Sequence, residues 1–136
     1  MTKHFQLLEH TADVKLKATG ATAEEALAVL VAGFADYQKP EKEKLIQGIN
    51  RSISVNFSHR KFLPADLLNE IIFLQEENKE LYPQISGIKI GTKNFSASLT
   101  AAKALRRRLD VKAATYNDIV FEKKGREWVI EVVTDV

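Results

Sequence analysis

Three carboxylates near the two ends of the chain are the groups best placed to do chemistry. Asp135 is the penultimate residue, and Val136 carries the α-carboxylate one residue further on. Two carboxylates this close repel each other unless positive charge lies between them, and either a hard divalent cation or a lysine would supply it. Asp13 completes such a cluster if the first and last strands lie side by side. A solvated acidic chain end explains the same residues, and by themselves the residues favour that plainer interpretation.

Two histidines, His10 and His59, are the candidates for acid–base chemistry, because histidine titrates near neutral pH without help from its surroundings. No serine or threonine is convincingly placed beside either one as a nucleophile, and a lone histidine is usually structural. The sequence contains no cysteine, which excludes a disulfide framework, a thiol nucleophile and zinc sites built from thiolates.

Basic residues crowd the stretch from Lys103 to Lys112, in which Asp110 is the one acidic residue. Such a stretch is usually a solvated loop; its functional interpretation is contact with phosphate or with an acidic partner. No aromatic side chains alternate with the basic ones to stack bases. The whole chain has 20 basic and 18 acidic residues, a net charge of +2. The stretch therefore predicts at most a weak or indirect contact with RNA.

Length and composition predict a globular protein of a single domain, residues 1–136. Hydrophobic residues make up 45% of the chain and charged residues 28%, which is the balance of a soluble protein. No run of about 18 apolar residues is present, and the N-terminus lacks the apolar stretch of a signal peptide. We therefore expect no membrane span and a cytoplasmic location.

The elements that must position the candidate residues are many short strands and two main helices. A capping box formed by Thr22 and Glu25 predicts that the first helix begins there and ends near Tyr37. Pro64 and Asp66 suit the first turn of a second helix. The prolines are expected where elements begin or end, and a charged loop is expected over 39–44. Period-two alternation predicts strands at 5–9, 14–18, 49–57, 88–90, 95–99, 111–116, 119–121 and 128–133, with hairpin turns at 91–94 and 123–126.

Hairpins dominate this order and the helices come singly, which is typical of an α+β fold. We expect a mostly antiparallel or mixed β-sheet of about seven or eight strands, with two main helices packed on one face. A Rossmann domain would alternate strand and helix regularly. The sequence also lacks the Rossmann glycine fingerprint, the HExxH zinc motif, the GxSxG elbow and the EF-hand loop.

Three stretches of the sequence resemble the archease family. Near the start stands Glu9-His10-Thr11-Ala12-Asp13-Val14, followed by Gly20 and Ala23-Glu24-Glu25-Ala26. The middle stretch runs from Asp66 to Leu74, and the last comprises Val111-Lys112-Ala113-Ala114-Thr115-Tyr116 and the segment from Trp128 to Val136. The resemblance covers essentially the whole chain. Each motif alone is weak, but their combination is specific.

The resemblance implies a small protein cofactor that is not itself an enzyme. Archeases assist the GTP-dependent RNA ligase that joins tRNA halves after intron removal. They promote its covalent guanylate intermediate, allow multiple turnover and can broaden the nucleotides that it accepts. The resemblance also implies a site for a divalent cation, typically calcium, with Asp13, Asp135 and Val136 as ligands. Glu25, Lys112 and His10 are the implied candidates for binding the ligase.

This sequence departs from the family pattern in several places. Asn117 follows Tyr116 where archeases commonly have a histidine, and the segments 59–61 and 101–108 are more basic than usual. These changes point to a different partner surface or to direct RNA contact. Two other functions stay open: a general chaperone or adaptor for RNA-processing enzymes and, ranked last, a metal-dependent hydrolase using Asp13, Asp135 and His10.

Overall fold

The computed structural model describes residues 3–9, 13–38, 46–103, 107 and 109–136. Two α-helices and eight β-strands occur in this part of the chain, which confirms the expected α+β class and the number of elements. In chain order they are β1 (His4–Glu9), β2 (Asp13–Gly20), α1 (Ala23–Gln38), β3 (Ile46–Asn56), the short 3-10 helix η1 (Arg60–Phe62), α2 (Leu63–Asn78), β4 (Glu80–Ile90), β5 (Asn94–Lys103), β6 (Ala113–Ala114), β7 (Val120–Lys124) and β8 (Glu127–Asp135).

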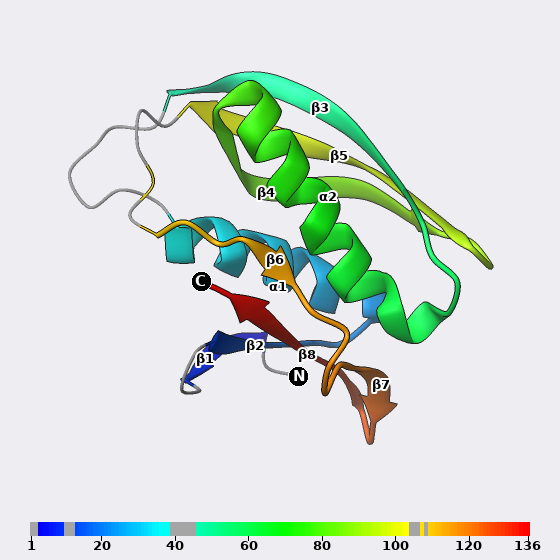
Figure 1. Ribbon diagram of the computed structural model, residues 1–136. Coiled ribbons are helices and arrows are strands. Elements are labelled where there is room, and N and C mark those ends of the chain that lie inside the picture. The colour runs from blue at the N-terminus through cyan, green and yellow to red at the C-terminus, as the bar shows by residue number, and fades with distance from the viewer. Residues whose placement is uncertain (1–2, 10–12, 39–45, 104–106, 108) are drawn as a thin grey trace.

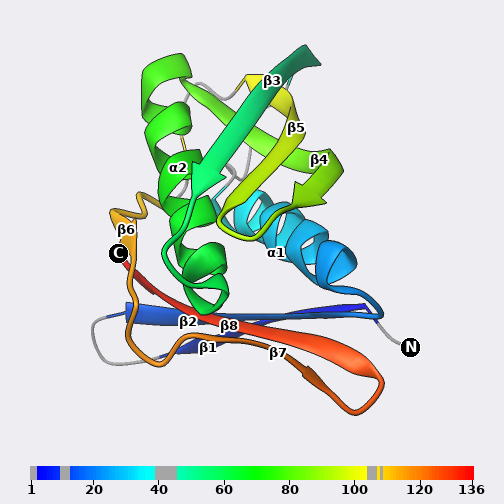
Figure 2. The same ribbon diagram turned by 90° about the vertical axis from the view of Figure 1, so that its right-hand side faces the viewer.

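The strands form two antiparallel sheets, where the sequence suggested one. The first sheet has five strands in the order β1-β2-β8-β6, and β7 also pairs with β8. The second has three strands in the order β3-β5-β4. Strands β1, β2, β7 and β8 of the first sheet lie at the bottom of both views in Figures 1 and 2, with α1 above them. Helix α1 packs against both β2 and β4, while α2 packs against β3, β4 and β6.

One core joins the two sheets and the two helices. Its fully buried side chains include Leu16 of β2, Leu30 of α1, Leu68 of α2, Phe95 of β5 and Val132 of β8, each at most 1% exposed. Burying a side chain of this size contributes about 1.5–3 kcal/mol. Among the described residues, neither helix has the length and apolar character needed to cross a membrane.

Helix α1 begins as the sequence predicts. The amide of Glu25 donates a hydrogen bond to Thr22 Oγ1 at 3.0 Å, and Glu25 Oε1 accepts one from the amide of Ala21 at 2.8 Å. One backbone donor in the first turn and one just before the helix are thereby satisfied. Further along, Gly33 allows β1 to approach closely, because a Cβ atom at this position would lie 2.3 Å from the ring of Phe5.

Three local expectations are wrong. Pro83 does not mark a strand end but lies inside β4, at a register shift between Leu81 and Gln84 that removes the need for its missing N–H. The strand expected over 111–116 is reduced to the two residues of β6. Period-two alternation over 49–57 puts Ile49 on the same apolar face as Ile53 and Val55, but Ile49 is 41% exposed because it lies beside a bulge at Gly48, near the strand end. The loop expected at 39–44 lies outside the described residues.

Candidate metal and docking site at one end of the first sheet

Asp13 and Asp135 lie directly opposite each other on neighbouring antiparallel strands. Cβ atoms of such a pair are about 4.5–5.5 Å apart, and both side chains point to the same face of the sheet. Two like charges in this arrangement destabilise the sheet unless a positive group lies between them. Asp13 Oδ1 is shielded from solvent, which strengthens its electrostatic interactions. The folded chain therefore brings together two residues that are more than a hundred positions apart in the sequence.

The acidic pair lies on the face of the sheet turned away from the helices. Strand side chains alternate between faces, and Leu16 and Val132, which belong to the core, point toward α1. Asp13 and Asp135 are an odd number of residues from these positions, so they point the other way. Figure 2 shows both helices on the core side of this sheet. On this face Asp135 is exposed, while Asp13 is half-buried.

The end of β8 is held from both sides by neighbouring segments. On one side it pairs with β2 up to Asp135. On the other, the amide of Lys112 donates to the carbonyl of Asp135 at 2.9 Å, and the amide of Thr115 donates to Val133 at 2.8 Å. Val136 follows at once and is 41% exposed. Val136 therefore directly follows the anchored end of β8.

Carboxylate oxygens are the donors that a hard divalent cation prefers. Calcium takes about six to eight oxygen ligands and accepts carboxylates in flexible geometry, while softer metals prefer nitrogen or sulfur. Asp13, Asp135 and the carboxylate of Val136 offer oxygen donors only. Within the described part of the chain, no group of three or more His, Cys, Asp or Glu side chains is placed to hold a metal. Water or a partner protein would have to complete the coordination.

The structure separates the partner-binding candidates. Lys112 lies beside Asp135, with its side chain exposed. Glu25 is at the other end of the sheet, because it follows Gly20, and β2 places Gly20 about 23 Å from Asp13 at roughly 3.3 Å per residue. Its observed contact is the helix cap. His10 lies outside the described residues.

Comparison with known proteins identifies the chain. Residues 5–136 match the model of the Archease protein family (MTH1598/TM1083). The chain belongs to the archease family. The archease of Methanosarcina barkeri is 29% identical over 143 residues, which cover 98% of this chain and 97% of that protein.

Two solved structures share the archease fold. The solution structure of protein 1598 from Methanobacterium thermoautotrophicum superposes with a TM-score of 0.76 at 19% identity, over 97% of this chain and 98% of the other. The crystal structure of the archease from Thermotoga maritima (TM1083), described as a possible chaperone, gives a TM-score of 0.62 at 21% identity, over 95% and 94% of the chains.

Residues in the two segments that are more basic than is usual in archeases, 59–61 and 101–108, make contacts within the molecule. Arg107, within the basic stretch, contacts Glu76 of α2 and lies 3.7 Å from Asp110. The ring of His59 packs edge-on against Phe62. Asn117 follows Tyr116, whose hydroxyl donates a hydrogen bond to Asp66, and this bond raises the pKa of Tyr116. At least part of the basic stretch is therefore engaged within the molecule.

Sequence reasoning missed one ion pair close to the acidic pair. Lys15 Nζ lies 3.4 Å from Glu131 Oε1, on the same open face as Asp13 and Asp135. The alternation of the two strands was a usable signal, because Lys15 is two residues from Asp13 and Glu131 is four from Asp135.

Sequence reasoning also missed a buried charged cluster in the second sheet. Arg51 donates two hydrogen bonds to the buried Glu80, at 3.1 and 2.8 Å, and the hydroxyl of Tyr82 donates a third at 3.1 Å. The hydrogen bonds from the Arg51 guanidinium hold the pKa of Glu80 below its ordinary value, while burial raises the pKa of Tyr82.

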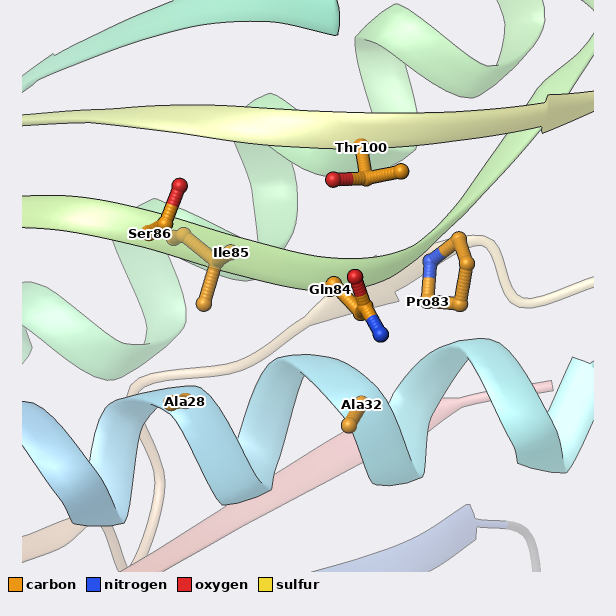
Figure 3. Close-up of a pocket in the computed structure, with 7 residues that line it drawn as sticks. All are labelled: Ala28, Ala32, Pro83, Gln84, Ile85, Ser86 and Thr100. Carbon is orange, nitrogen blue, oxygen red and sulfur yellow. The ribbon is translucent and has the colours of Figure 1, made fainter. Parts of the chain in front are cut away.

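A groove between α1 and β4 contains no group suited to acid–base catalysis. It encloses about 290 Å³ and, as Figure 3 shows, lies between the helix and the strand. It is lined by Ala28, Ala32, Pro83, Gln84, Ile85, Ser86 and Thr100. None of these side chains titrates near neutral pH, so the groove offers no acid or base for hydrolysis.

Proposed function

We propose that this archease is a non-enzymatic cofactor of a GTP-dependent tRNA-splicing RNA ligase. It promotes guanylylation of the ligase, sustains multiple turnover and broadens the nucleotides that the ligase accepts. The observation that carries the proposal is the direct opposition of Asp13 and Asp135 on the open face of a sheet in a chain of this family. We propose a cytoplasmic location for this role.

In this proposal Asp13, Asp135 and Val136 hold a divalent cation, typically calcium in this family. When bound, the cation supplies a fixed positive charge beside the nucleotide-binding histidine of the ligase. The protein's own groups do the positioning. Pairing with β2 orients Asp13 toward Asp135, and the backbone hydrogen bond from Lys112 fixes the end of β8. The site is thus rigid before the ligase arrives, which lowers the entropic cost of binding.

The exposed side chains around the acidic pair form the contact with the ligase in this proposal. Lys112 belongs to this contact because it lies beside Asp135. His10 belongs to it by its position three residues before Asp13. Glu25 would contact the ligase separately, at the opposite end of β2, so a partner touching both must span most of the sheet.

The proposal is tested by multiple-turnover ligation with the cognate ligase and GTP. Three variants run beside the wild type: Asp13→Asn, a deletion of residues 135–136, and Glu122→Gln as a control on the same sheet. Glu122 is exposed, and its Cα pairs with Val129, six residues from Asp135. We expect stimulation by wild type and control, and loss of it in the first two variants. If stimulation survives in both acidic-site variants, the ligase remains the partner, but the acidic residues are not the functional site.

A chaperone or adaptor for RNA-processing enzymes is the second candidate. The description of the Thermotoga maritima archease as a possible chaperone favours it. This function predicts that the protein suppresses aggregation of unrelated client proteins and that Asp13→Asn does so equally well. Ligation that stays at about one turnover with an active ligase, together with such protection, would select this candidate over the first.

A further inference from the structure

Lys15 occupies a position between two sets of carboxylates. Its Cα pairs with Val133 of β8, and Val133 lies midway between Glu131 and Asp135. Diagonal neighbours across an antiparallel pair are about 7–8 Å apart, within reach of a long side chain. Asp13 lies two residues away on the same strand and the same face. The ammonium group of Lys15 can therefore reach Glu131 on one side or the acidic pair on the other.

In the structure Lys15 takes the Glu131 side. The Nζ–Oε1 distance is 3.4 Å, and the two side chains are only 18% and 20% exposed. Val133, directly opposite Lys15, is 5% exposed although it points to the open face, as expected beneath a long aliphatic stem. An ion pair this shielded is screened less than one in open solvent. Glu131 therefore holds the ammonium at a defined place.

Lys17 increases the importance of Glu131. Its Cα pairs directly with that of Glu131, and it lies on the open face beside Lys15. Glu131 thus faces two lysines of β2, Lys17 directly and Lys15 diagonally. Without its carboxylate, the two ammonium groups repel each other, and the nearest other carboxylates on β2 and β8 for Lys15 are Asp13 and Asp135.

We propose that Glu131 is a positioning residue that holds the ammonium group of Lys15 away from the Asp13–Asp135 pair and thereby sets its affinity for a divalent cation. The inference rests on the cation site of the proposed function. A lysine and a cation are alternative ways to neutralise the same carboxylates. Release of Lys15 toward the acidic pair therefore competes with the cation, and removal of Lys15 favours it.

Calorimetric titration of the full chain with calcium chloride tests this inference through affinity rather than ligase activity. The set comprises wild type, Glu131→Gln, Lys15→Met, the double variant, and Glu122→Gln as a control for loss of one carboxylate on the same sheet. We expect Glu131→Gln to weaken calcium binding about threefold to fivefold, the size of a partly screened charge effect, and Lys15→Met to strengthen it by a similar factor. The control should stay within about twofold of wild type.

The double variant separates positioning from simple charge. If Glu131 acts through Lys15, Glu131→Gln has no further effect once Lys15 is Met, and the double variant binds calcium as Lys15→Met does. An equal loss in both backgrounds means that Glu131 acts only by its own negative charge, and overturns the inference. If wild type binds no calcium, or Asp13→Asn binds it equally well, the cation site and this inference both fail. Ligase stimulation is measured separately and can survive either result.

Discussion

The side-chain amide of Asn69 on α2 pairs with the backbone of Ala114 on β6 as another strand would. Asn69 Nδ2 donates to the carbonyl of Ala114 at 3.0 Å, and the amide of Ala114 donates to Asn69 Oδ1 at 2.8 Å. The helix thus satisfies the edge of a two-residue strand that has β8 on its other side. Since β6 flanks Asp135, this contact links the second helix to the acidic pair.

Replacing Asn69 by Ala should destabilise the protein by about 2 kcal/mol, because the buried backbone groups of Ala114 lose both partners. Urea unfolding measures the loss. Amide hydrogen exchange should show faster exchange at Ala114, Lys112 and Thr115 than at the centre of β2. Asn50→Ala, at an exposed position of β3, is the matched control. Unchanged protection at Ala114 would contradict the structural role given to Asn69.

Calcium should raise the thermal stability of the wild type and not of Asp13→Asn. A ligand at a hundred times its Kd stabilises the folded state by about 2.7 kcal/mol when it does not bind the unfolded chain. In excess chelator the wild type should be no more stable than Asp13→Asn, because this substitution also removes the repulsion between the opposed carboxylates. Thermal melts in calcium and in chelator measure both effects. Equal calcium shifts in the two proteins would place the cation elsewhere.

Glu80 should make stability depend on pH in the acid range. Hydrogen bonds from Arg51 hold the folded-state pKa of Glu80 below its ordinary value of 4.5. The unfolded chain therefore binds the proton more readily, and this contribution is present above pH 4.5 and is lost as the pH falls through the folded pKa. Urea unfolding from pH 7 to 3 should show wild type losing its advantage over Glu80→Gln below about pH 4.5. A constant difference between the two proteins would exclude this linkage.

The buried amides of Gln38 and Gln75 should show strong coupling. They join α1 to α2 by two reciprocal hydrogen bonds of 3.0 Å, and both residues are at most 1% exposed. Replacing either one by Leu leaves the other amide buried without this partner and should cost about 2 kcal/mol. The double Leu variant should cost less than the sum, because it removes both polar groups. Strictly additive losses in urea unfolding would show that the two amides are independent.

Local signals predicted much of the fold because their physics is local. The capping box needs only Thr22 and Glu25 three residues apart, and the turn before Asn94 needs only its own residues. Alternation likewise placed Asp135 on one face of its strand. These patterns survive in the structure because nearby residues alone satisfy them.

The division into two sheets depends on contacts that no local pattern contains. Pro83 looks like a boundary in the sequence, yet β4 continues through it by means of a bulge. Glu25 and Lys112 both belong to motifs shared with the family, and the sequence does not separate them in space. In the structure β2 runs between them, so Glu25 lies at the end of the sheet far from Asp13. The sequence predicted that Asp13 lies beside Asp135 only if the first and last strands are neighbours. That pairing joins residues more than a hundred positions apart, and no local pattern reveals it.

The position of β8 between β2 and its other partners has a consequence during synthesis. Residues of β8 bond to β2 across a separation of 120 positions, as between Thr134 and Val14. At a synthesis rate of about 5–20 residues per second, roughly ten seconds pass between the synthesis of β2 and that of β8. An edge left open so long invites pairing with another nascent chain. Lys15 and Lys17 place two like charges on that strand, and charged side chains of this kind disfavour pairing of an exposed edge with another chain.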